Sequence, residues 1–325
     1  MSILYPLKFQ PIYKHYVWGG KKLAKLKNIK LKNDETISES WELSSVSDNI
    51  SVVSNGFLAG NSLQEILEIY MGDLVGESVY EKYGIEFPVL LKFIDAEQSL
   101  SVQVHPDDEI ALQRHNAYGK EEMWYILEAE KDAEVCIGFN QKTDKKSFEK
   151  YLKDKALLDL LNFEKIKNGD VFEVPSGRIH AIKQGTLLAE IQNTSDITYR
   201  VYDWEREYDP EKAREMHIDL ALDVIDYNNY KSYKTDYSLI KNNRSELCKN
   251  EHFKVNIIDF DNAVICDYSA IDSFVAYMCV CGDAILECGK HKETITKGET
   301  ILVPAAIDEI KLIPNSHTRL LEISM

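Results

Sequence analysis

Two histidines, a glutamate and a glutamine are the residues of this chain that could together hold a metal ion. Gln103 and His105 lie two residues apart in the alternating segment SLSVQVH (99–105), so both side chains point to one face of the expected strand. Glu122 comes at the start of the next expected strand, and His180 follows a later corner. Two imidazoles, a carboxylate and an amide oxygen suit zinc or another borderline divalent ion and leave room for water or substrate. For Gln103 alone, a polar strand residue without a metal is the favoured interpretation.

A turn, a short strand and a tight corner precede His180. The segment GDVFEVPSGRIH (169–180) contains a β-branched and aromatic strand, and Gly169, Pro175 and Gly177 mark the places where the chain must bend. This spacing resembles the second motif of the cupin superfamily, whose fold is a jelly-roll β-barrel. A histidine just past such a corner can point into the barrel and bind a metal. The alternative is an ordinary β-turn with a surface histidine.

The same pattern returns near the end of the chain. The segment GETILVPAAIDE (298–309) has the glycine, the strand and the proline, but Ala306 replaces the second glycine and Glu309 replaces the histidine. This repetition predicts an internal duplication in which the second copy has no metal ligands. We therefore expect a mostly β chain with two cupin-like jelly-roll β-barrels, the catalytic barrel in residues 1–235 and a degenerate barrel in residues 236–325.

A few helices are expected as insertions in the first barrel. Apolar residues recur at helical spacing after an N-cap at Ser62, which predicts an amphipathic helix over about 62–83. A second helix is predicted over about 145–161, with Phe148 on its buried side. Both helices have an ordinary core-facing side, so we expect them to support the barrel.

Composition and charge argue against several classes of function. The chain has 325 residues, of which 44% are hydrophobic and 28% are charged, as is typical of a globular protein. Its formal net charge of −16 argues against general binding to nucleic acids or to anionic membrane surfaces. No apolar run reaches the length of a membrane span, and the N-terminal segment lacks the hydrophobic region of a signal peptide, so a cytoplasmic location is expected. Basic residues that bind an anionic substrate must therefore be placed locally.

Four ordered motifs make the sequence similar to a known family. They are SLSVQVHPDD (99–108), GKEEMW (119–124), VPSGRIH (174–180) and SDITYRVYD (195–203), and the match extends through WGG (18–20), SESWE (38–42) and MHIDLALD (216–223). This set resembles the type I phosphomannose isomerases. More narrowly, it is similar to the short bacterial form, which lacks the large helical insertion of the fungal and animal enzymes. The C-terminal third matches mainly in its barrel pattern.

The resemblance implies one zinc ion per chain, held by Gln103, His105, Glu122 and His180. It also implies interconversion of D-mannose 6-phosphate and D-fructose 6-phosphate through a cis-enediol intermediate. The partner is then a small-molecule sugar phosphate, with no nucleic acid and no membrane, and a monomer or weak homodimer is expected. Residue 121 is commonly threonine in the family, whereas Glu121 is here a rival of Glu122 for the same metal.

Further residues are candidates for proton transfer and for substrate binding. An aldose–ketose shift needs a base that moves a proton between C2 and C1 and a positive group near the enediolate oxygens. Family likeness places Arg200 in the site, as the group that stabilises the enediolate. Glu190 is the favoured proton-transfer residue, and Lys120 competes with it for that role. Lys92, Lys120 and Ser101 are expected to contact the phosphate or the sugar.

Two of these side chains have alternative roles. Lys92 lies in the apolar run FPVLLKFI (87–94), where an unpaired buried charge costs several kcal/mol, so it must either reach solvent or meet an anion. Arg200 could instead form an ion pair with Asp196 or Asp203 at the edge of the core. The sequence leaves both alternatives open.

Two other functions are compatible with the same residues. One is a non-catalytic metal-binding cupin that binds a sugar phosphate, and the other is an iron cupin dioxygenase, because two histidines and a carboxylate also suit Fe(II). A pure binder would not need Glu190 and Arg200 beside the metal. A dioxygenase would more usually have a histidine in place of Gln103. The isomerase is therefore the favoured prediction.

Overall fold

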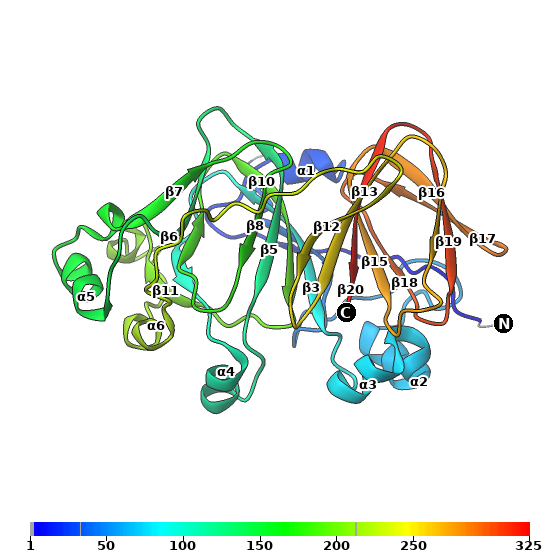
Figure 1. Cartoon of the computed structure of the whole chain (residues 1–325), viewed down its shortest axis with the longest axis horizontal. Helices are drawn as coiled ribbons and strands as arrows, with labels where there is room; N and C mark the ends of the chain where they lie inside the picture. The colour runs from blue at the N-terminus through cyan, green and yellow to red at the C-terminus, as the bar shows by residue number, and fades with distance from the viewer. Residues whose placement is uncertain (1–2, 33, 212) are drawn as a thin grey trace.

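The computed structural model describes residues 3–32, 34–211 and 213–325, and its strands form four sheets in two pairs (Figure 1). The strands of the first pair are β1 (Ile12–Lys14), β2 (Glu39–Leu43), β3 (Val89–Ala96), β4 (Val102–Val104), β5 (Glu122–Ala129), β6 (Glu134–Phe139), β7 (Leu161–Lys165), β8 (Val171–Val174), β9 (His180–Ile182), β10 (Thr186–Asn193) and β11 (Tyr199–Tyr202). They form a six-stranded antiparallel sheet in the order β1-β2-β3-β10-β5-β8 and a five-stranded one in the order β11-β4-β9-β6-β7.

The second pair of sheets comes from the C-terminal part of the chain. Its strands are β12 (Asn243–Lys249), β13 (Lys254–Phe260), β14 (Val264–Asp267), β15 (Val275–Cys281), β16 (Asp283–Cys288), β17 (His291–Thr296), β18 (Thr300–Val303), β19 (Glu309–Pro314) and β20 (Thr318–Ser324). The sheet orders are β12-β13-β20-β15-β18 and β14-β19-β16-β17. The expectation of a mostly β chain with two barrel-like units is confirmed, although each pair of sheets is an open sandwich and not a closed barrel.

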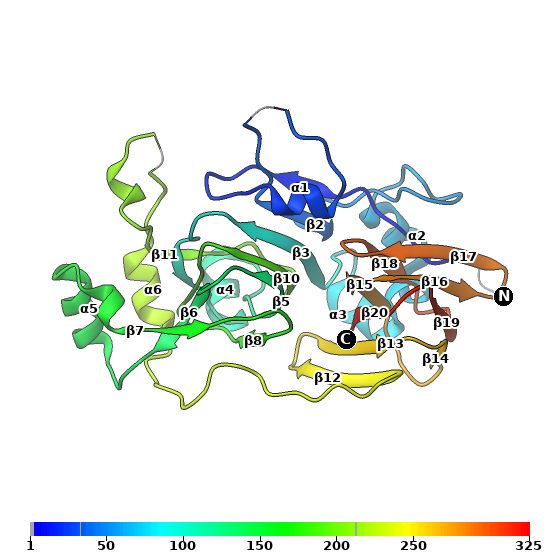
Figure 2. The same ribbon diagram turned by 90° about the horizontal axis from the view of Figure 1, so that it is seen from above.

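Apolar side chains hold each pair of sheets together and also join the two pairs. Inside the first pair, Ile126 of β5 and Leu188 of β10 belong to the same cluster as Ile137 of β6. The opposite face of β10 presents Ile191 to a larger core that also contains Leu321 of β20. The two pairs therefore lie side by side along the long axis of the molecule and share a core (Figures 1 and 2). The boundary near residue 235 stays a prediction.

The helices lie at the ends and edges of the sheets. They are α1 (Lys22–Leu26), α2 (Leu63–Val75), α3 (Glu77–Tyr83), α4 (Asp108–His115), α5 (Lys145–Lys153) and α6 (Ile218–Val224), with short 3-10 turns at Leu157–Asp159 and Arg206–Tyr208. The helix predicted over 62–83 is confirmed as α2 and α3, which begin with a capping box between Ser62 and Glu65 and are interrupted at Met71 and Gly76. None of the described helices is long and apolar enough to span a membrane.

The helix predicted over 145–161 is wrong in its second half. α5 ends at Lys153, and Lys155 has a φ of 57°, a left-handed conformation that does not continue an α-helix. Leu158, which continues the helical spacing in the sequence, is only partly buried, whereas Leu157 and Leu160 are buried by the 3-10 turn that leads into β7. The apolar residues after Lys153 therefore belong to this turn and not to the helix.

The two pairs of sheets carry corresponding residues in the same register. One row of neighbouring positions crosses β3, β10, β5 and β8 at Lys92, Glu190, Trp124 and Phe172. The corresponding row crosses β13, β20, β15 and β18 at Asn256, Glu322, Tyr277 and Ile301. Gly169 and Gly298 begin the repeated motif, and their N–H groups donate to the carbonyls of Ile126 and Cys279. Ile126 lies two residues beyond Trp124, and Cys279 lies two residues beyond Tyr277, at corresponding places in the two rows. This agreement in register supports the internal duplication. Glutamate is the one residue type that the two rows share, as Glu190 and Glu322.

Glu322, the retained glutamate of the second row, supports a stability prediction. Its buried carboxylate accepts hydrogen bonds from Arg244 Nε at 2.8 Å, from Asn256 Nδ2 at 2.9 Å and from the Tyr268 hydroxyl. We expect Glu322→Ala to lower the free energy of unfolding by about 3–5 kcal/mol, because it leaves a partly buried guanidinium without its counter-charge. Urea unfolding measures the loss.

An exposed ion pair gives the matched control for Glu322→Ala. The side chain of Lys165 is 76% exposed and lies 3.6 Å from Asp132, so Lys165→Ala should cost less than about 1 kcal/mol. Equal losses in the two variants would show that the buried network contributes no more than a surface pair. The metal content of Glu322→Ala should not change, since the substitution lies in the second pair of sheets.

Candidate metal centre and active site

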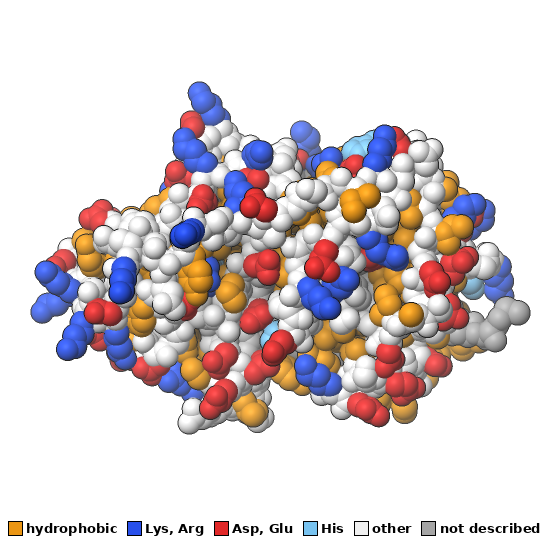
Figure 3. Space-filling view, viewed as in Figure 1, with side chains coloured by type: hydrophobic (Ala, Val, Ile, Leu, Met, Phe, Trp, Pro, Cys, Tyr) orange, Lys and Arg blue, Asp and Glu red, His pale blue; other side chains and the backbone are white. Residues whose placement is uncertain are grey.

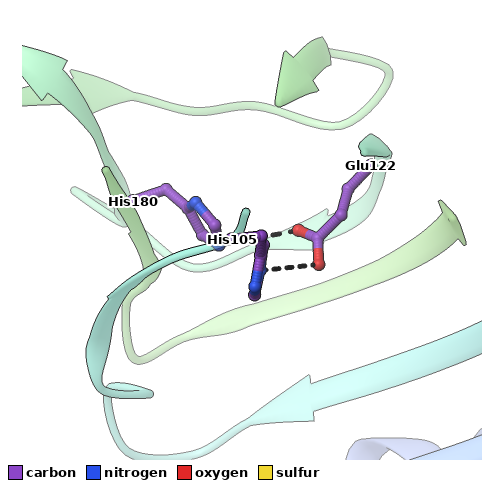
Figure 4. Close-up of side chains that lie close together, drawn as sticks. All are labelled: His105, Glu122 and His180. Carbon is purple, nitrogen blue, oxygen red and sulfur yellow. Dashed lines mark ion pairs between the residues drawn. The ribbon is translucent and has the colours of Figure 1, made fainter. Parts of the chain in front are cut away.

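Three buried side chains from different strands converge inside the first pair of sheets (Figure 4). His105 directly follows β4, Glu122 is the first residue of β5, and His180 is the first residue of β9. One ligand atom from each of the three lies within 4.8 Å of the other two. The structure thus brings together three of the four predicted metal ligands, although His105 and His180 are 75 positions apart in the sequence.

The hydrogen bonds of the two imidazoles fix their tautomers. His105 Nδ1 lies 2.8 Å from the carbonyl oxygen of Ile197, and His180 Nδ1 lies 2.8 Å from that of Arg178. A carbonyl oxygen only accepts, so each Nδ1 carries the proton and each Nε2 presents a lone pair. Burial lowers the pKa of His105 to about 3 and also lowers the pKa of His180, so both rings are neutral at neutral pH.

These lone pairs face a carboxylate, which is unfavourable without a cation. His105 Nε2 lies 3.2 Å from Glu122 Oε1, and His180 Nε2 lies 3.6 Å from Glu122 Oε2 (Figure 4). Both Nε2 atoms are buried and make no hydrogen bond. A divalent cation would convert this repulsion into coordination, and the carbonyl partners of Nδ1 are the outer partners that metal-bound histidines usually have. The donor set therefore fits a metal ion.

The structure distinguishes between the two adjacent glutamates. Glu122 belongs to the metal cluster and Glu121 does not; Glu121 lines a second cavity, which Glu122 also borders, together with Glu173. The Glu121 backbone N–H donates to Asn193 Oδ1 at 2.7 Å. Gln103, the fourth predicted ligand, pairs through its backbone with His180 and lines the same cavity as Glu122, so its role as a ligand remains a prediction.

Glu122 is held in its ionised form by its neighbours. Lys120 Nζ lies 2.8 Å from Glu122 Oε1, and Trp124 Nε1 donates to Oε2 at 3.2 Å. Burial opposes ionisation, but the positive charge of Lys120 keeps the pKa of Glu122 well below its ordinary value. The carboxylate is therefore available as an anionic ligand.

Glu190 and Lys92 form a second buried pair beside the metal cluster. Lys92 Nζ donates to Glu190 Oε1 at 3.0 Å and to Gln192 Oε1 at 2.6 Å, so the lysine of the apolar run meets an anion. Trp124 Nε1 donates to the other oxygen of Glu190 at 3.0 Å. Burial and the nearby charge of Glu122 raise the pKa of Glu190, which makes its carboxylate a stronger base than an exposed one.

Arg200 does not form the ion pairs that its sequence neighbours allow. Its Nε donates to Ser101 Oγ at 3.2 Å and its Nη1 donates to the carbonyl oxygen of Glu215 at 2.6 Å. Asp203 instead accepts hydrogen bonds from Arg206 at 2.8 Å and from Arg214 at 3.0 Å. The guanidinium of Arg200 therefore has neutral hydrogen-bond partners. It keeps its charge even though burial lowers its pKa.

One cavity of about 350 Å³ connects these groups. Its walls include all the residues predicted for catalysis and for substrate binding, namely Lys92, Ser101, Lys120, Glu190 and Arg200. The same cavity reaches two of the four predicted metal ligands, Gln103 and Glu122. A small polar molecule in this cavity therefore has Glu190, Lys92, Lys120 and Arg200 among the walls around it.

Comparisons with known proteins decide which family this arrangement represents. Residues 6–151 match the family described as phosphomannose isomerase type I, catalytic domain. Mannose-6-phosphate isomerase ManA of Bacillus subtilis is 33% identical over 325 aligned positions, which cover 94% of this chain and 95% of that protein. The chain belongs to the type I phosphomannose isomerase family. The prediction that it is an enzyme of this family is confirmed.

Other members of the family agree with this assignment. The mannose-6-phosphate isomerase of Streptococcus mutans is 38% identical over 68% of this chain and 67% of that protein. The crystal structure of the mannose 6-phosphate isomerase from Bacillus subtilis superposes with a TM-score of 0.87 at 28% identity, covering 99% of this chain and all of that one. Structures of the phosphomannose isomerase from Salmonella typhimurium share the fold at 17% identity, with a TM-score of 0.80.

Several residues in or beside this cavity were not predicted from the sequence. Trp124 donates one indole N–H toward both Glu122 and Glu190, and Trp41 forms a wall of the cavity. Asp203 holds Arg214, which also lines the cavity. The alternation of SESWEL and EMWYIL already places both tryptophans on the inward face, and this was the signal available for finding them.

Proposed function

We propose that the protein interconverts D-mannose 6-phosphate and D-fructose 6-phosphate, with one zinc ion held by Gln103, His105, Glu122 and His180. The observation that carries the proposal is the buried His105–Glu122–His180 cluster, whose Nε2 lone pairs converge on a carboxylate beside the cavity. Relatives that align with nearly the whole chain are named mannose-6-phosphate isomerases, which supports the same substrate.

The cavity supplies the groups that an aldose–ketose shift needs. We assign proton transfer between C2 and C1 to Glu190, because its carboxylate is buried, has a raised pKa and is fixed by Lys92 and Trp124. Lys120 remains the competing candidate, although it lies 2.8 Å from the ionised Glu122. Zinc, when bound, would act as a Lewis acid on the substrate oxygens. Arg200 would stabilise the negative charge of the cis-enediolate.

Replacing Arg200 should separate catalysis from metal binding. We expect Arg200→Ala to lower kcat by roughly 100- to 1,000-fold, because it removes a fixed positive charge near the developing oxyanion. The zinc content should stay at the wild-type value, since Arg200 contacts Ser101 and Glu215 and no member of the metal cluster. Steady-state kinetics and metal analysis on the same preparation test this. A parallel fall in zinc would make Arg200 a structural residue.

The proposed function is tested by a coupled assay for conversion of mannose 6-phosphate to fructose 6-phosphate. The assay is run before chelation, after chelation and after return of either zinc or ferrous iron. Loss of activity on chelation and recovery with zinc are expected. Absence of turnover in the zinc-loaded protein, with sugar-phosphate binding retained, would instead favour the non-catalytic binder.

A further inference from the structure

We propose that Lys14 of β1 binds the phosphate group of the substrate. This rests on the proposed function and names the residues that recognise one part of its substrate. Five cationic side chains line the cavity, namely Lys14, Lys92, Lys120, Arg200 and Arg214. Their existing partners show which of them are available to a further anion.

Three of the five cations are already neutralised by carboxylates. Lys92 pairs with Glu190 and Lys120 pairs with Glu122, as described above. Arg214 Nε donates to the fully buried Asp203 at 3.0 Å. A substrate phosphate would have to compete with these short contacts. The lysines that the sequence suggested for the phosphate are therefore better placed to act on the reacting end of the sugar.

Lys14 has no carboxylate partner among the residues that the structure describes. Its ammonium group donates to the amide oxygen of Asn49 and lies 4.4 Å from the centre of the Trp41 ring. Glu39, opposite Lys14 in the register of β1 and β2, accepts the indole N–H of Trp41 at 2.5 Å. An ammonium group has three donors, and a neutral amide and an aromatic face leave its charge uncompensated. Among the described residues Arg200 also has neutral hydrogen-bond partners, but the proposed function assigns it to the enediolate at the other end of the sugar.

The charges already present in the cavity explain why the phosphate group needs a cation such as Lys14. Its walls also include four acidic side chains, namely Glu39, Glu122, Glu190 and Asp196. The chain has a net charge of −16, and acidic and basic side chains are interspersed on the face shown in Figure 3. A phosphate monoester carries close to two negative charges at neutral pH. Because carboxylates already pair with Lys92, Lys120 and Arg214, the phosphate needs a cation that is not already neutralised.

The position of Lys14 suits the far end of a six-carbon sugar. The Trp41 ring lies 4.4 Å from Lys14 Nζ and 5.2 Å from Lys92 Nζ, so the two nitrogens are no more than about 10 Å apart. Lys92 in turn holds Glu190, the residue assigned to proton transfer. This upper limit allows an open-chain hexose to have its phosphate at Lys14 and its C1–C2 end at Glu190.

The test compares Lys14→Met with the wild-type enzyme. We expect KM for mannose 6-phosphate to rise roughly 10- to 100-fold with kcat within about threefold, because a charge-assisted contact to the phosphate is lost. The inhibition constant of inorganic phosphate should rise in the same proportion, and kcat/KM for unphosphorylated mannose should not change. Lys14→Arg should restore most of the affinity for both phosphate compounds.

Lys183→Met is the matched control. Lys183 also lies over an aromatic ring, 4.6 Å from the centre of Phe163, but it pairs with Glu134 at 2.9 Å and does not line the cavity. This variant should keep the wild-type KM. The proposal is overturned if Lys14→Met leaves KM unchanged, lowers kcat alone, or affects mannose and its phosphate equally.

The proposed isomerase function and the phosphate-binding role of Lys14 can be contradicted separately. A wild-type protein without turnover of mannose 6-phosphate would contradict the proposed function and not the role of Lys14. Calorimetric titration of the zinc-loaded wild-type and Lys14→Met proteins with inorganic phosphate would then decide, because weaker binding to the variant is expected independently of turnover. Equal binding to both proteins would exclude Lys14 from the anion site.

Discussion

The His180→Ala variant is expected to lose its bound metal and its isomerase activity together. His180 supplies one of two neutral Nε2 lone pairs that face Glu122, and alanine leaves no donor on that side of the cluster. Substitution of even the outer partners of metal ligands costs about 10- to 100-fold in affinity or activity, so loss of a direct ligand should exceed about 100-fold. Metal analysis after dialysis and the coupled isomerase assay measure both quantities.

A histidine outside the site provides the control for this variant. His317 pairs with Asp259 at 2.8 Å in the second pair of sheets, and its side chain is about half exposed. His317→Ala should keep the wild-type zinc content and turnover. Full activity of His180→Ala after chelation would contradict the metal role. A variant that keeps its zinc but loses turnover would place His180 in the chemistry and not in the coordination.

The Glu190→Gln variant is expected to bind zinc normally and to lose most of its turnover. Glutamine has nearly the same shape and can still accept from Lys92, but it cannot take up a proton. A positioned general base contributes roughly 100- to 10,000-fold, so kcat should fall within that range. Burial raises the pKa of the wild-type carboxyl group, and only the ionised form acts as a base. Wild-type kcat should therefore fall as the pH drops through this raised pKa.

Lys120→Met is the comparison that assigns the base. Lys120 contacts Glu122, so its loss should affect zinc affinity as well as turnover. If Glu190 is the base, Glu190→Gln should lose the acid limb of the pH profile at an unchanged zinc content. The alternative assignment would follow if Glu190→Gln kept near-normal kcat while Lys120→Met, at full zinc occupancy, lost it.

Much of the site could be predicted from the sequence because its signals are local. Strand alternation placed Gln103 and His105 on one face, and the glycine–proline corner before His180 identified the second ligand-bearing segment. The same corner, repeated at 298–309, identified the duplication that the strand register supports. Each of these signals depends on a few consecutive residues, whose backbone preferences act within one strand or turn.

The tertiary structure alone decided which of these residues meet. It placed Glu122, and not Glu121, in the metal cluster and paired Lys92 with the carboxylate of Glu190. It also gave Arg200 hydrogen bonds to Ser101 and Glu215 in place of an ion pair with Asp203. It also ended the helix predicted over 145–161 at Lys153. These outcomes depend on hydrogen-bond register and packing between segments far apart in the chain, such as β3 with β10. A one-residue shift in that register would turn every side chain of a strand to its other face. β3 and β10 are buried on both faces, so apolar alternation within either segment does not fix their register.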